Sequence, residues 1–345
     1  MKVAIVGGGI IGLTTASQLN RELRNAEVTV FASDFNDTVS HVAAGLFRVG
    51  SSYSGPTEEI TRDWLRDSYA YYDNIRKSHE ASSAGVTAIS GYMFANSSPE
   101  TVKSHWMKDL VPIYRRVTDE EFQLVEGNWK YGSFFSTLLT ECKLHLPWAR
   151  KKLEENGTKL IVKKVDSLRE LVSDWDLIIN CTGLGARYLC NDRYLVPMRG
   201  QVFKVKAPWM KTFFYGEIDT YIIPGFNGVV TLGGSRYFGS ENKKLCPYES
   251  KAIRERCENL LPSLKKAELV KEEVGLRPHR ENNVRVEVEH IVNGFSKAIV
   301  SFNETLLISL VHNYGHGGYG VCTAPGTAKY AVQLAKEMHK STAKL

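Results

Sequence analysis

The chain lacks any C-x-x-C pair, and its six cysteines show no spacing typical of a metal site. We therefore expect no metal and no disulfide framework, but reduced and mostly buried thiols. No apolar run approaches the ~20 residues that a membrane-spanning helix needs, so we expect no membrane partner. No block of Lys and Arg is interleaved with aromatic residues, which argues against binding of nucleic acid.

Internal repeats and low-complexity linkers are missing as well. A chain of 345 residues that is 43% hydrophobic can bury a large core, so we expect one large or two medium domains. The net charge of +6 is spread along the chain and is compatible with a weak attraction for anionic substrates. No Ser-His-Asp set and no pair of carboxylates stands out. What the chain does contain is a glycine-rich segment near each end.

The first glycine-rich segment, 7–12, follows the apolar run 3–6 and precedes a segment, 11–23, that we predict to be helical. Its glycines fit G-x-G-x-x-G in the strand–turn–helix context in which this motif binds a dinucleotide. The first glycine permits the tight turn, the second lets the backbone approach a pyrophosphate, and the third lets the helix pack against the strand. The predicted cofactor contacts are Gly7, Gly8, Gly9, Ile10, Ile11 and Gly12. The motif alone leaves FAD and NAD(P) open.

An acidic residue after the second predicted strand, 27–31, usually holds the ribose of the dinucleotide. Asp34 is the candidate, because it arrives about 22 to 25 residues after the glycines. The second glycine-rich segment, 312–320, lies close to the other end of the sequence. Its position suggests that the same cofactor is bound again, at its other end.

The remaining pattern predicts two kinds of sheet. Continuous apolar runs at 160–162 and 176–180 are typical of a parallel sheet that is covered on both faces. The segments 201–205, 221–225 and 229–234 look like antiparallel strands separated by turns. Further helices are predicted over 57–80, 141–155, about 249–260 and 326–339. Elements of the nucleotide-binding kind occur early, in the middle and late, so the two domains should be discontinuous.

Seven motifs, in order along nearly the whole chain, resemble the D-amino-acid oxidase family. They are the start through Gly12, then 42–46 (Val-Ala-Ala-Gly-Leu), 179–183 (Ile-Asn-Cys-Thr-Gly), 199–201 (Arg-Gly-Gln), 221–225 (Tyr-Ile-Ile-Pro-Gly), 275–278 (Gly-Leu-Arg-Pro) and 312–320. The resemblance implies an α/β fold in which a Rossmann-like FAD-binding domain is interleaved with an α+β substrate domain built on a mainly antiparallel sheet. It assigns 1–50, 140–198 and 277–345 to the FAD-binding domain, and 51–139 and 199–276 to the substrate domain.

The activity that the resemblance implies is oxidative deamination of a D-amino acid with non-covalently bound FAD. A hydride passes from the substrate Cα to the flavin N5, water hydrolyses the imino acid to a 2-oxo acid and ammonia, and oxygen becomes hydrogen peroxide. The protein then has to orient the substrate, while the cofactor carries the chemistry. The expected partners are therefore a small-molecule substrate and oxygen, and an oligomer is compatible with the sequence.

The resemblance also implies roles for single residues. Arg277 should clamp the substrate α-carboxylate, which a guanidinium binds well in a bidentate pair. Tyr221 should donate its hydroxyl to the same carboxylate, and the backbone of Gly318 should accept from the substrate amine. Residues 317–321 should run under the pyrimidine end of the flavin and stabilise negative charge there. The further FAD contacts implied are Ser40, Ala44, Gly45, Leu46, Val165, Thr182, Gly315, Gly317, Gly318, Tyr319, Gly320 and Val321.

Substrate choice is expected to depend on Arg236. Family members that oxidise neutral D-amino acids resemble this strand but carry an apolar residue there, whereas those that oxidise D-aspartate carry Arg. A second guanidinium in the pocket would pair with the side-chain carboxylate of D-aspartate, and D-glutamate should be tolerated. It would be left uncompensated by a neutral substrate, which costs several kcal/mol. The sequence therefore favours acidic D-amino acids, with neutral D-amino acids as the alternative.

Several positions depart from the family pattern. The lid-like segment 215–220 lacks the Arg expected in aspartate-specific members, and its Glu217 and Asp219 are expected to face solvent. Arg48 stands where other members have a polar or apolar residue, and it is a candidate for the missing positive charge. Ser33 takes the usual place of the ribose-binding acid, and Cys322 replaces a hydroxyl residue near the flavin.

Two other classes use the same N-terminal motif. An NAD-dependent dehydrogenase would leave the motifs at 275–278 and 312–320 without an explanation. A catalytically silent flavin-binding protein is disfavoured because Arg277, Tyr221 and the 312–320 segment occur together. The last residues, Ala343-Lys344-Leu345, resemble the peroxisomal signal Ser-Lys-Leu. We therefore expect recognition by the peroxisomal import receptor and a location in the peroxisomal matrix, which suits an enzyme that makes hydrogen peroxide.

Overall fold

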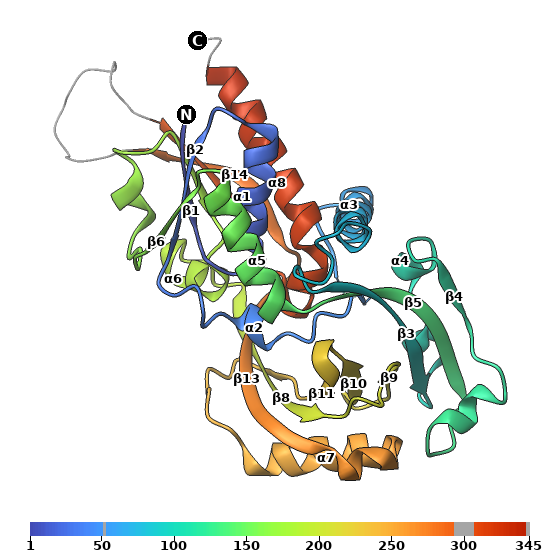
Figure 1. Cartoon of the computed structure of the whole chain (residues 1–345). Helices are drawn as coiled ribbons and strands as arrows, with labels where there is room; N and C mark the ends of the chain where they lie inside the picture. The colour runs from blue at the N-terminus through green and yellow to red at the C-terminus, as the bar shows by residue number, and fades with distance from the viewer. Residues whose placement is uncertain (51–52, 293–306, 343–345) are drawn as a thin grey trace, which may run out of the picture.

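The computed structural model describes residues 1–50, 53–292 and 307–342, which form two sheets covered by helices (Figure 1). The first sheet has the strand order β14-β15-β7-β1-β2-β6. Its strands are β1 (Lys2–Val6), β2 (Glu27–Ala32), β6 (Lys159–Val162), β7 (Leu177–Asn180), β14 (Arg285–Val292) and β15 (Leu307–Tyr314). All neighbours in it are parallel except β14 and β15. Segments from three distant parts of the sequence thus build one sheet, as expected of a Rossmann-like layer.

The strands of the first sheet differ in how deeply they are buried. All four residues of β7 are buried, as is the 3–6 run of β1. The edge strand β6 is different, because the Val162 side chain is 71% exposed. The expectation that the strand at 160–162 is covered on both faces is therefore wrong, since an edge position leaves one side of β6 open.

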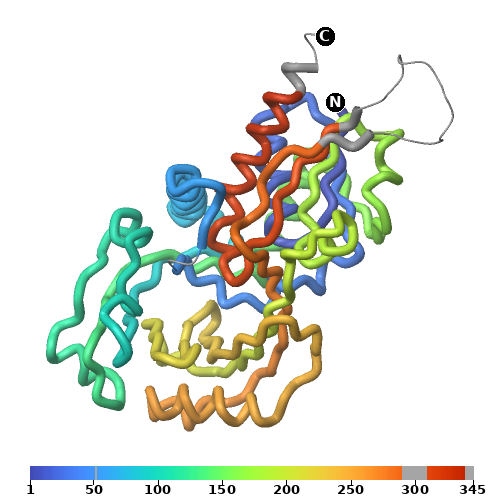
Figure 2. The backbone as a smooth tube through the Cα atoms, turned by 180° about the vertical axis from the view of Figure 1, so that it is seen from behind, coloured from blue at the N-terminus to red at the C-terminus, as the bar shows by residue number. Residues whose placement is uncertain are grey.

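Helices from both ends of the chain pack together against the first sheet. The α-helices that the structure describes in both layers are α1 (Ile10–Glu22), α2 (Val39–Val42), α3 (Glu58–Arg76), α4 (His105–Lys108), α5 (Cys142–Glu155), α6 (Ala186–Leu189), α7 (Pro247–Leu260) and α8 (Gly320–Thr342). α1 contacts α8 and α5, and α3 contacts α8. From behind, the blue N-terminal and red C-terminal segments share one layer, and the orange segment of α7 lies in the other (Figure 2).

The last helix begins earlier than the sequence indicates. α8 starts at Gly320, whereas the sequence predicted a start at 326. The prediction was late because Pro325 and Gly326, which are weak helix formers, lie inside the first turns of the helix. Pro325 has no N–H to donate to the carbonyl of Val321 four residues before it. The Tyr72 hydroxyl donates to that carbonyl instead, at 2.7 Å. A contact from a distant helix therefore compensates for the proline.

The second sheet is mainly antiparallel and has the order β12-β8-β11-β10-β9-β3-β5-β4, with β13 also paired to β8. Only β3 and β9 run parallel among its described pairs. Its strands are β3 (Val86–Ala95), β4 (Ile113–Arg116), β5 (Tyr131–Thr140), β8 (Leu195–Lys206), β9 (Phe213–Tyr215), β10 (Tyr221–Pro224), β11 (Val229–Gly233), β12 (Tyr237–Phe238) and β13 (Glu268–Arg280). This confirms the predicted fold class, while the exact domain boundaries stay a prediction.

Three further observations bear on the expectations from sequence. All six cysteines are free, and four of them are buried. No helix within the described ranges is long and apolar enough to cross a membrane. Residues 343–345, on which the prediction of peroxisomal import depends, lie outside the described residues.

A buried histidine in α5 predicts how stability responds to acid. The Nδ1–H of His145 donates to the Ala84 carbonyl at 3.0 Å, and burial lowers the pKa of the imidazole to about 4. The unfolded chain takes up this proton below pH ~6.5 and the folded chain only near pH 4, so protonation favours unfolding in that window. We expect the free energy of unfolding, measured in urea, to fall as the pH drops from 6.5 towards 4. His145→Phe should remove at most about 1.4 kcal/mol per pH unit of that slope. An unchanged slope in the variant would contradict the assignment.

Candidate functional site

A cavity of about 920 Å³ lies where the two sheets meet. Its walls come from the N-terminal ends of α1 and α8, the 39–48 segment, β8, β13 and the 215–221 region. The cavity therefore joins elements that carry both glycine-rich segments to elements that carry the predicted substrate-binding residues.

The N-terminal turn holds α1 tightly against β1. Gly7 has φ +126°, and a Cβ at this residue would collide with the Cys181 carbonyl oxygen. A Cβ at Gly12 would collide with the carbonyl oxygen of Gly7. The close packing explains why the first and third positions of the motif need glycine. The amide of Ile10, in the first turn of α1, donates to Ser40 Oγ at 3.1 Å, so Ser40 lies at the positive end of the helix dipole.

The C-terminal glycine-rich segment turns the chain from β15 into α8. Gly315 and Gly317 have φ of +93° and +55°, in the left-handed region that favours glycine. The turn continues through the short 3₁₀ helix η7 (Gly317–Tyr319) into the N-terminus of α8. Both glycine-rich segments thus bring a helix N-terminus to one cavity, where two positive dipole ends can stabilise an anionic ligand.

One buried acceptor supports a bound cofactor in this cavity. The Asn313 side chain is fully buried and lines the cavity. Its Nδ2 donates to Thr15 Oγ1 at 3.2 Å, while its Oδ1 has no hydrogen-bond partner in the described part of the chain. A buried acceptor without a donor is costly, so a ligand that donates a hydrogen bond here would stabilise the fold. The donor-rich turns and this acceptor fit the predicted FAD.

The other predicted cofactor contacts separate into two groups. The predicted contacts that line the cavity are Ile10, Ile11, Ser40, Ala44, Gly45, Leu46, Gly315, Gly317, Gly318, Tyr319, Gly320 and Val321. The N-terminal glycines, Asp34, Val165 and Thr182 lie outside that lining. The Asp34 carboxylate accepts from the amides of Asn36 and Asp37, at 2.6 and 3.2 Å, and these bonds lower its pKa. Thr182 Oγ1 donates to Asn180 Oδ1 at 2.7 Å, and Val165 packs in an apolar cluster.

Arg277 and Tyr221 come together at the wall of the cavity. Arg277 lies in β13 opposite Met198 of β8, and its Nη1 donates to the Ser235 carbonyl at 3.1 Å. A Cβ at Gly200 would collide with the guanidinium, so glycine makes the space that Arg277 occupies. Gly318 is also adjacent, since a Cβ on it would lie 3.6 Å from Arg277 Cδ.

Tyr221 occupies a space that two further glycines, Gly233 and Gly234, leave open. A Cβ at Gly233 would collide with the Tyr221 ring, and one at Gly234 would come within 2.6 Å of the hydroxyl. Burial raises the pKa of Tyr221, and the positive charge of Arg277 offsets part of this rise. The hydroxyl therefore stays protonated at neutral pH and can donate a hydrogen bond beside the guanidinium.

Arg236 lines the cavity, but unlike the expected free guanidinium it is paired with an acidic side chain. Its Nη2 lies 2.8 Å from Asp219 Oδ1, and the two side chains are 52% and 36% exposed. Its charge is therefore already balanced by an acidic neighbour. Glu217 and Asp219 both border the cavity, and both residues are partly exposed, so they also face solvent as expected. The Glu217 carboxylate accepts from the amides of Asn96 and Ser97 at 2.9 and 2.7 Å, which fixes the 215–220 segment to the end of β3.

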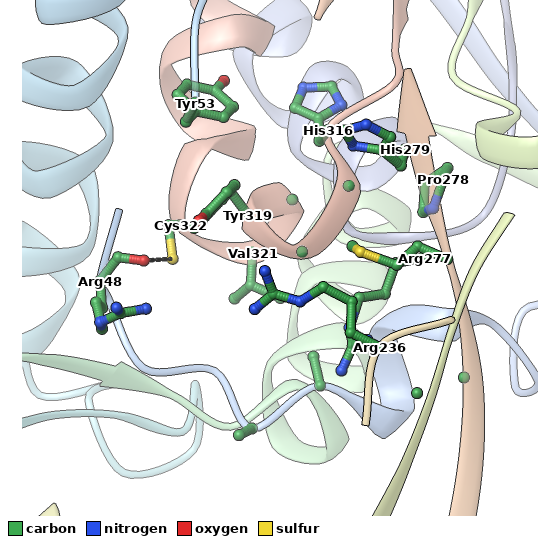
Figure 3. A pocket seen from close by; sticks show the side chains of 18 of the residues that line it. Arg48, Tyr53, Arg236, Arg277, Pro278, His279, His316, Tyr319, Val321 and Cys322 are labelled. Atoms are coloured by element: carbon green, nitrogen blue, oxygen red, sulfur yellow. Dashed lines mark hydrogen bonds between the residues drawn. The ribbon is translucent and has the colours of Figure 1, made fainter. Parts of the chain in front are cut away.

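Arg48 also lines the cavity, on the side away from Arg236 and Arg277 (Figure 3). Its guanidinium carbon lies 4.7 Å from the centroid of the Tyr215 ring, and its Nε donates to Met93 Sδ at 3.3 Å. Asn313, Tyr215 and Met93 had no predicted role. Asn313 lies inside the second glycine-rich segment, which could have drawn attention to it, whereas nothing local in the sequence marks the contacts of Tyr215 and Met93.

Comparisons with known proteins agree with this geometry. The family profile described as FAD dependent oxidoreductase (DAO) matches residues 2–334. D-aspartate oxidase of Homo sapiens is 35% identical over 338 residues, covering 97% of this chain and 95% of that protein. D-amino acid oxidase of Dugesia ryukyuensis is 30% identical over 342 residues, covering 98% of each.

The solved structures that resemble the chain share its fold. Glycine oxidase from Geobacillus kaustophilus gives a TM-score of 0.76 at 18% identity, covering 97% of this chain and 94% of that one. The L-alpha-glycerophosphate oxidase from Mycoplasma pneumoniae, solved with FAD bound, gives 0.76 at 16% identity with the same coverage.

Proposed function

The chain belongs to the D-amino-acid oxidase family of FAD-dependent oxidoreductases, and from this premise we propose that it is a D-aspartate oxidase that also accepts D-glutamate. FAD-dependent oxidation of amino acids is the activity common to its curated relatives. The preference for acidic substrates is our proposal, together with hydrogen peroxide as the reduced form of oxygen.

The observation that supports an acidic substrate is the excess of positive charge around the cavity. Four arginines line it; Arg236 is paired with Asp219 and Arg280 with Asp192, which leaves Arg277 and Arg48 without an ion pair to any residue that the structure describes. Arg277 suffices for the α-carboxylate that every amino acid carries. The remaining positive charge would stabilise a second carboxylate and disfavour a neutral side chain.

The residues of the chain have distinct parts in the proposed reaction. FAD, when bound, would supply the acceptor for the hydride of the substrate Cα. Arg277 and the protonated Tyr221 hydroxyl hold the α-carboxylate, and the Gly318 backbone beside them accepts from the amine, so that the Cα is oriented. The N-terminus of α8 brings a positive dipole end to the cavity, which would favour negative charge on a cofactor bound there.

Oxidation of neutral D-amino acids is the second candidate. It is favoured by the pair between Arg236 and Asp219, which neutralises the residue expected to bind the substrate side chain. The relative from Dugesia ryukyuensis, which bears the name D-amino acid oxidase, is compatible with this alternative.

Peroxide formation by the purified protein with excess FAD distinguishes the two candidates. We expect D-aspartate and D-glutamate to be oxidised with kcat/KM at least ~30-fold above that for D-alanine, because one buried carboxylate–guanidinium pair contributes about 2 kcal/mol or more. L-aspartate is the stereochemical control and should give no peroxide. A preference for D-alanine would support the second candidate. Absence of peroxide with all four amino acids would contradict both.

Location in peroxisomes is a further part of the proposal and rests on Ala343-Lys344-Leu345 alone. A fluorescent protein fused in front of the chain, with and without Leu345, tests it. Import that does not depend on Leu345 would contradict this assignment.

A further inference from the structure

The arginines of the cavity differ in whether a carboxylate already balances them. Arg236 is paired with Asp219 at 2.8 Å, and Arg280 with Asp192 at 2.8 Å. Arg277 and Arg48 form no ion pair within 4 Å with any acidic residue that the structure describes. The two acidic residues of the lining are also occupied, Asp219 by Arg236 and Glu217 by backbone amides. Two guanidinium charges in one cavity therefore remain to be balanced by a ligand.

The contacts of Arg48 fix the side chain and leave its outer nitrogens free. The guanidinium lies over the Tyr215 ring, and among the described residues it makes one hydrogen bond, from its Nε to Met93 Sδ. Neither terminal nitrogen of Arg48 has a hydrogen-bond partner within the described ranges. Stacking on an aromatic ring holds a guanidinium in place without using its donors, so Arg48 can present two N–H groups to a carboxylate.

Two neighbouring tyrosines, whose rings are tilted by 37° to each other, connect Arg48 with the α-carboxylate site. The Tyr215 ring centroid lies 5.7 Å from that of Tyr221, and Tyr221 lies beside Arg277. The sequence of contacts therefore runs from Arg48, on one side of the cavity, through Tyr215 and Tyr221 to Arg277 on the other side (Figure 3). A ligand that lies between the two sides meets one unpaired guanidinium at each end.

We propose that Arg48 determines substrate specificity by binding the side-chain carboxylate of the acidic substrate while Arg277 binds its α-carboxylate. The proposal rests on the proposed function and changes its detail, because sequence reasoning assigned this role to Arg236. A substrate carboxylate would have to displace Asp219 from Arg236, whereas Arg48 has no carboxylate to displace. A neutral D-amino acid would leave the Arg48 charge unbalanced in the closed site, which disfavours its binding.

The test compares four variants by the ratio of kcat/KM for D-aspartate to kcat/KM for D-alanine. Arg48→Met keeps an unbranched apolar stem and removes the guanidinium with its charge, and we expect the ratio to fall at least ~30-fold. Arg48→Lys keeps the charge without the planar fork, and should lie between Arg48→Met and wild type. Arg236→Leu should change the ratio less than Arg48→Met does. Arg62→Met is the matched control, because Arg62 also lies over an aromatic ring, Trp106, but outside the cavity lining.

A binding measurement separates the proposal from the proposed function. Succinate has the carbon chain of aspartate with both carboxylates, and butyrate has the same number of carbons with one. By calorimetry on the FAD-loaded protein, succinate should bind wild type at least ~30-fold more tightly than it binds Arg48→Met. Butyrate should show no such difference.

The outcomes are distinguishable. If the wild type oxidises D-alanine but not D-aspartate, the proposed function is wrong, and succinate binding alone decides about Arg48. If Arg236→Leu lowers the ratio more than Arg48→Met, or if succinate binds both proteins equally, Arg48 does not bind the second carboxylate. Should Arg48→Met fail to fold, Arg48→Lys and Arg236→Leu still rank the two sites.

Discussion

Replacing Arg277 by Met is expected to lower kcat/KM for every D-amino acid by about 10³-fold, whether its side chain is acidic or neutral. The guanidinium and the Tyr221 hydroxyl are adjacent at the cavity wall, and the space for both is made by glycines at 200, 233 and 234. Removing one partner of a desolvated carboxylate–guanidinium pair costs about 2 to 5 kcal/mol, and the loss of orientation at Cα adds to this cost. Arg277→Lys should recover little, because an ammonium cannot form the bidentate pair.

Steady-state peroxide formation measures the effect, and flavin absorbance of the same sample shows whether FAD is still bound. We expect normal FAD content, because the side chain reaches the wall of the cavity from β13 and not from either glycine-rich turn. The loss should be equal for D-aspartate and D-alanine, unlike the loss in Arg48→Met. Retention of activity within tenfold of wild type would show that the α-carboxylate is held elsewhere.

The position of Arg277 shows how far sequence reasoning reaches. Gly-Leu-Arg-Pro identified the residue as part of a site but did not indicate which kind of element carries it. In the structure it lies inside β13, and Pro278 is opposite Pro197 at the same pairing. The pairing of β13 with β8 brings together residues about 80 positions apart. No local sequence pattern indicates that these two strands pair. The local motif was therefore sufficient to identify Arg277 as a site residue, but it did not indicate the strand that carries Arg277 or the neighbours of its side chain.

The part of the cavity that the two glycine-rich segments line was predicted more completely from local sequence motifs. Strand, turn and helix follow one another in the first 22 residues, and the apolar runs at 3–6 and 176–180 indicate the buried strands β1 and β7. The specificity side depends instead on which charged side chains meet. Asp219 and Arg236 meet from two connections of the second sheet, 216–220 and 234–236, and Arg48 reaches Tyr215 of β9 from the segment between α2 and α3. Such pairings decide which positive charge remains for a ligand, and they cannot be obtained from spacing along the chain.

Gly12→Ala is expected to weaken FAD binding at least ~100-fold and to destabilise the fold. A Cβ at this position would collide with the Gly7 carbonyl oxygen, so α1 would have to move away from the turn after β1. That movement takes the helix N-terminus away from the cavity and strains the adjacent core, where overpacking costs about 1 to 3 kcal/mol. Titration of the apoprotein with FAD measures the affinity, and urea unfolding measures the stability.

Gly157→Ala is the matched control for this experiment. Gly157 follows α5 with φ +81°, and a Cβ there would meet nothing within 4 Å. The substitution should cost about 1 to 2 kcal/mol of stability through the left-handed backbone alone and leave FAD affinity unchanged. If Gly12→Ala loses stability to the same extent but binds FAD normally, the close packing of α1 on the turn serves the fold and not the cofactor. A loss of affinity in Gly12→Ala alone would instead tie the third glycine of the motif to cofactor binding.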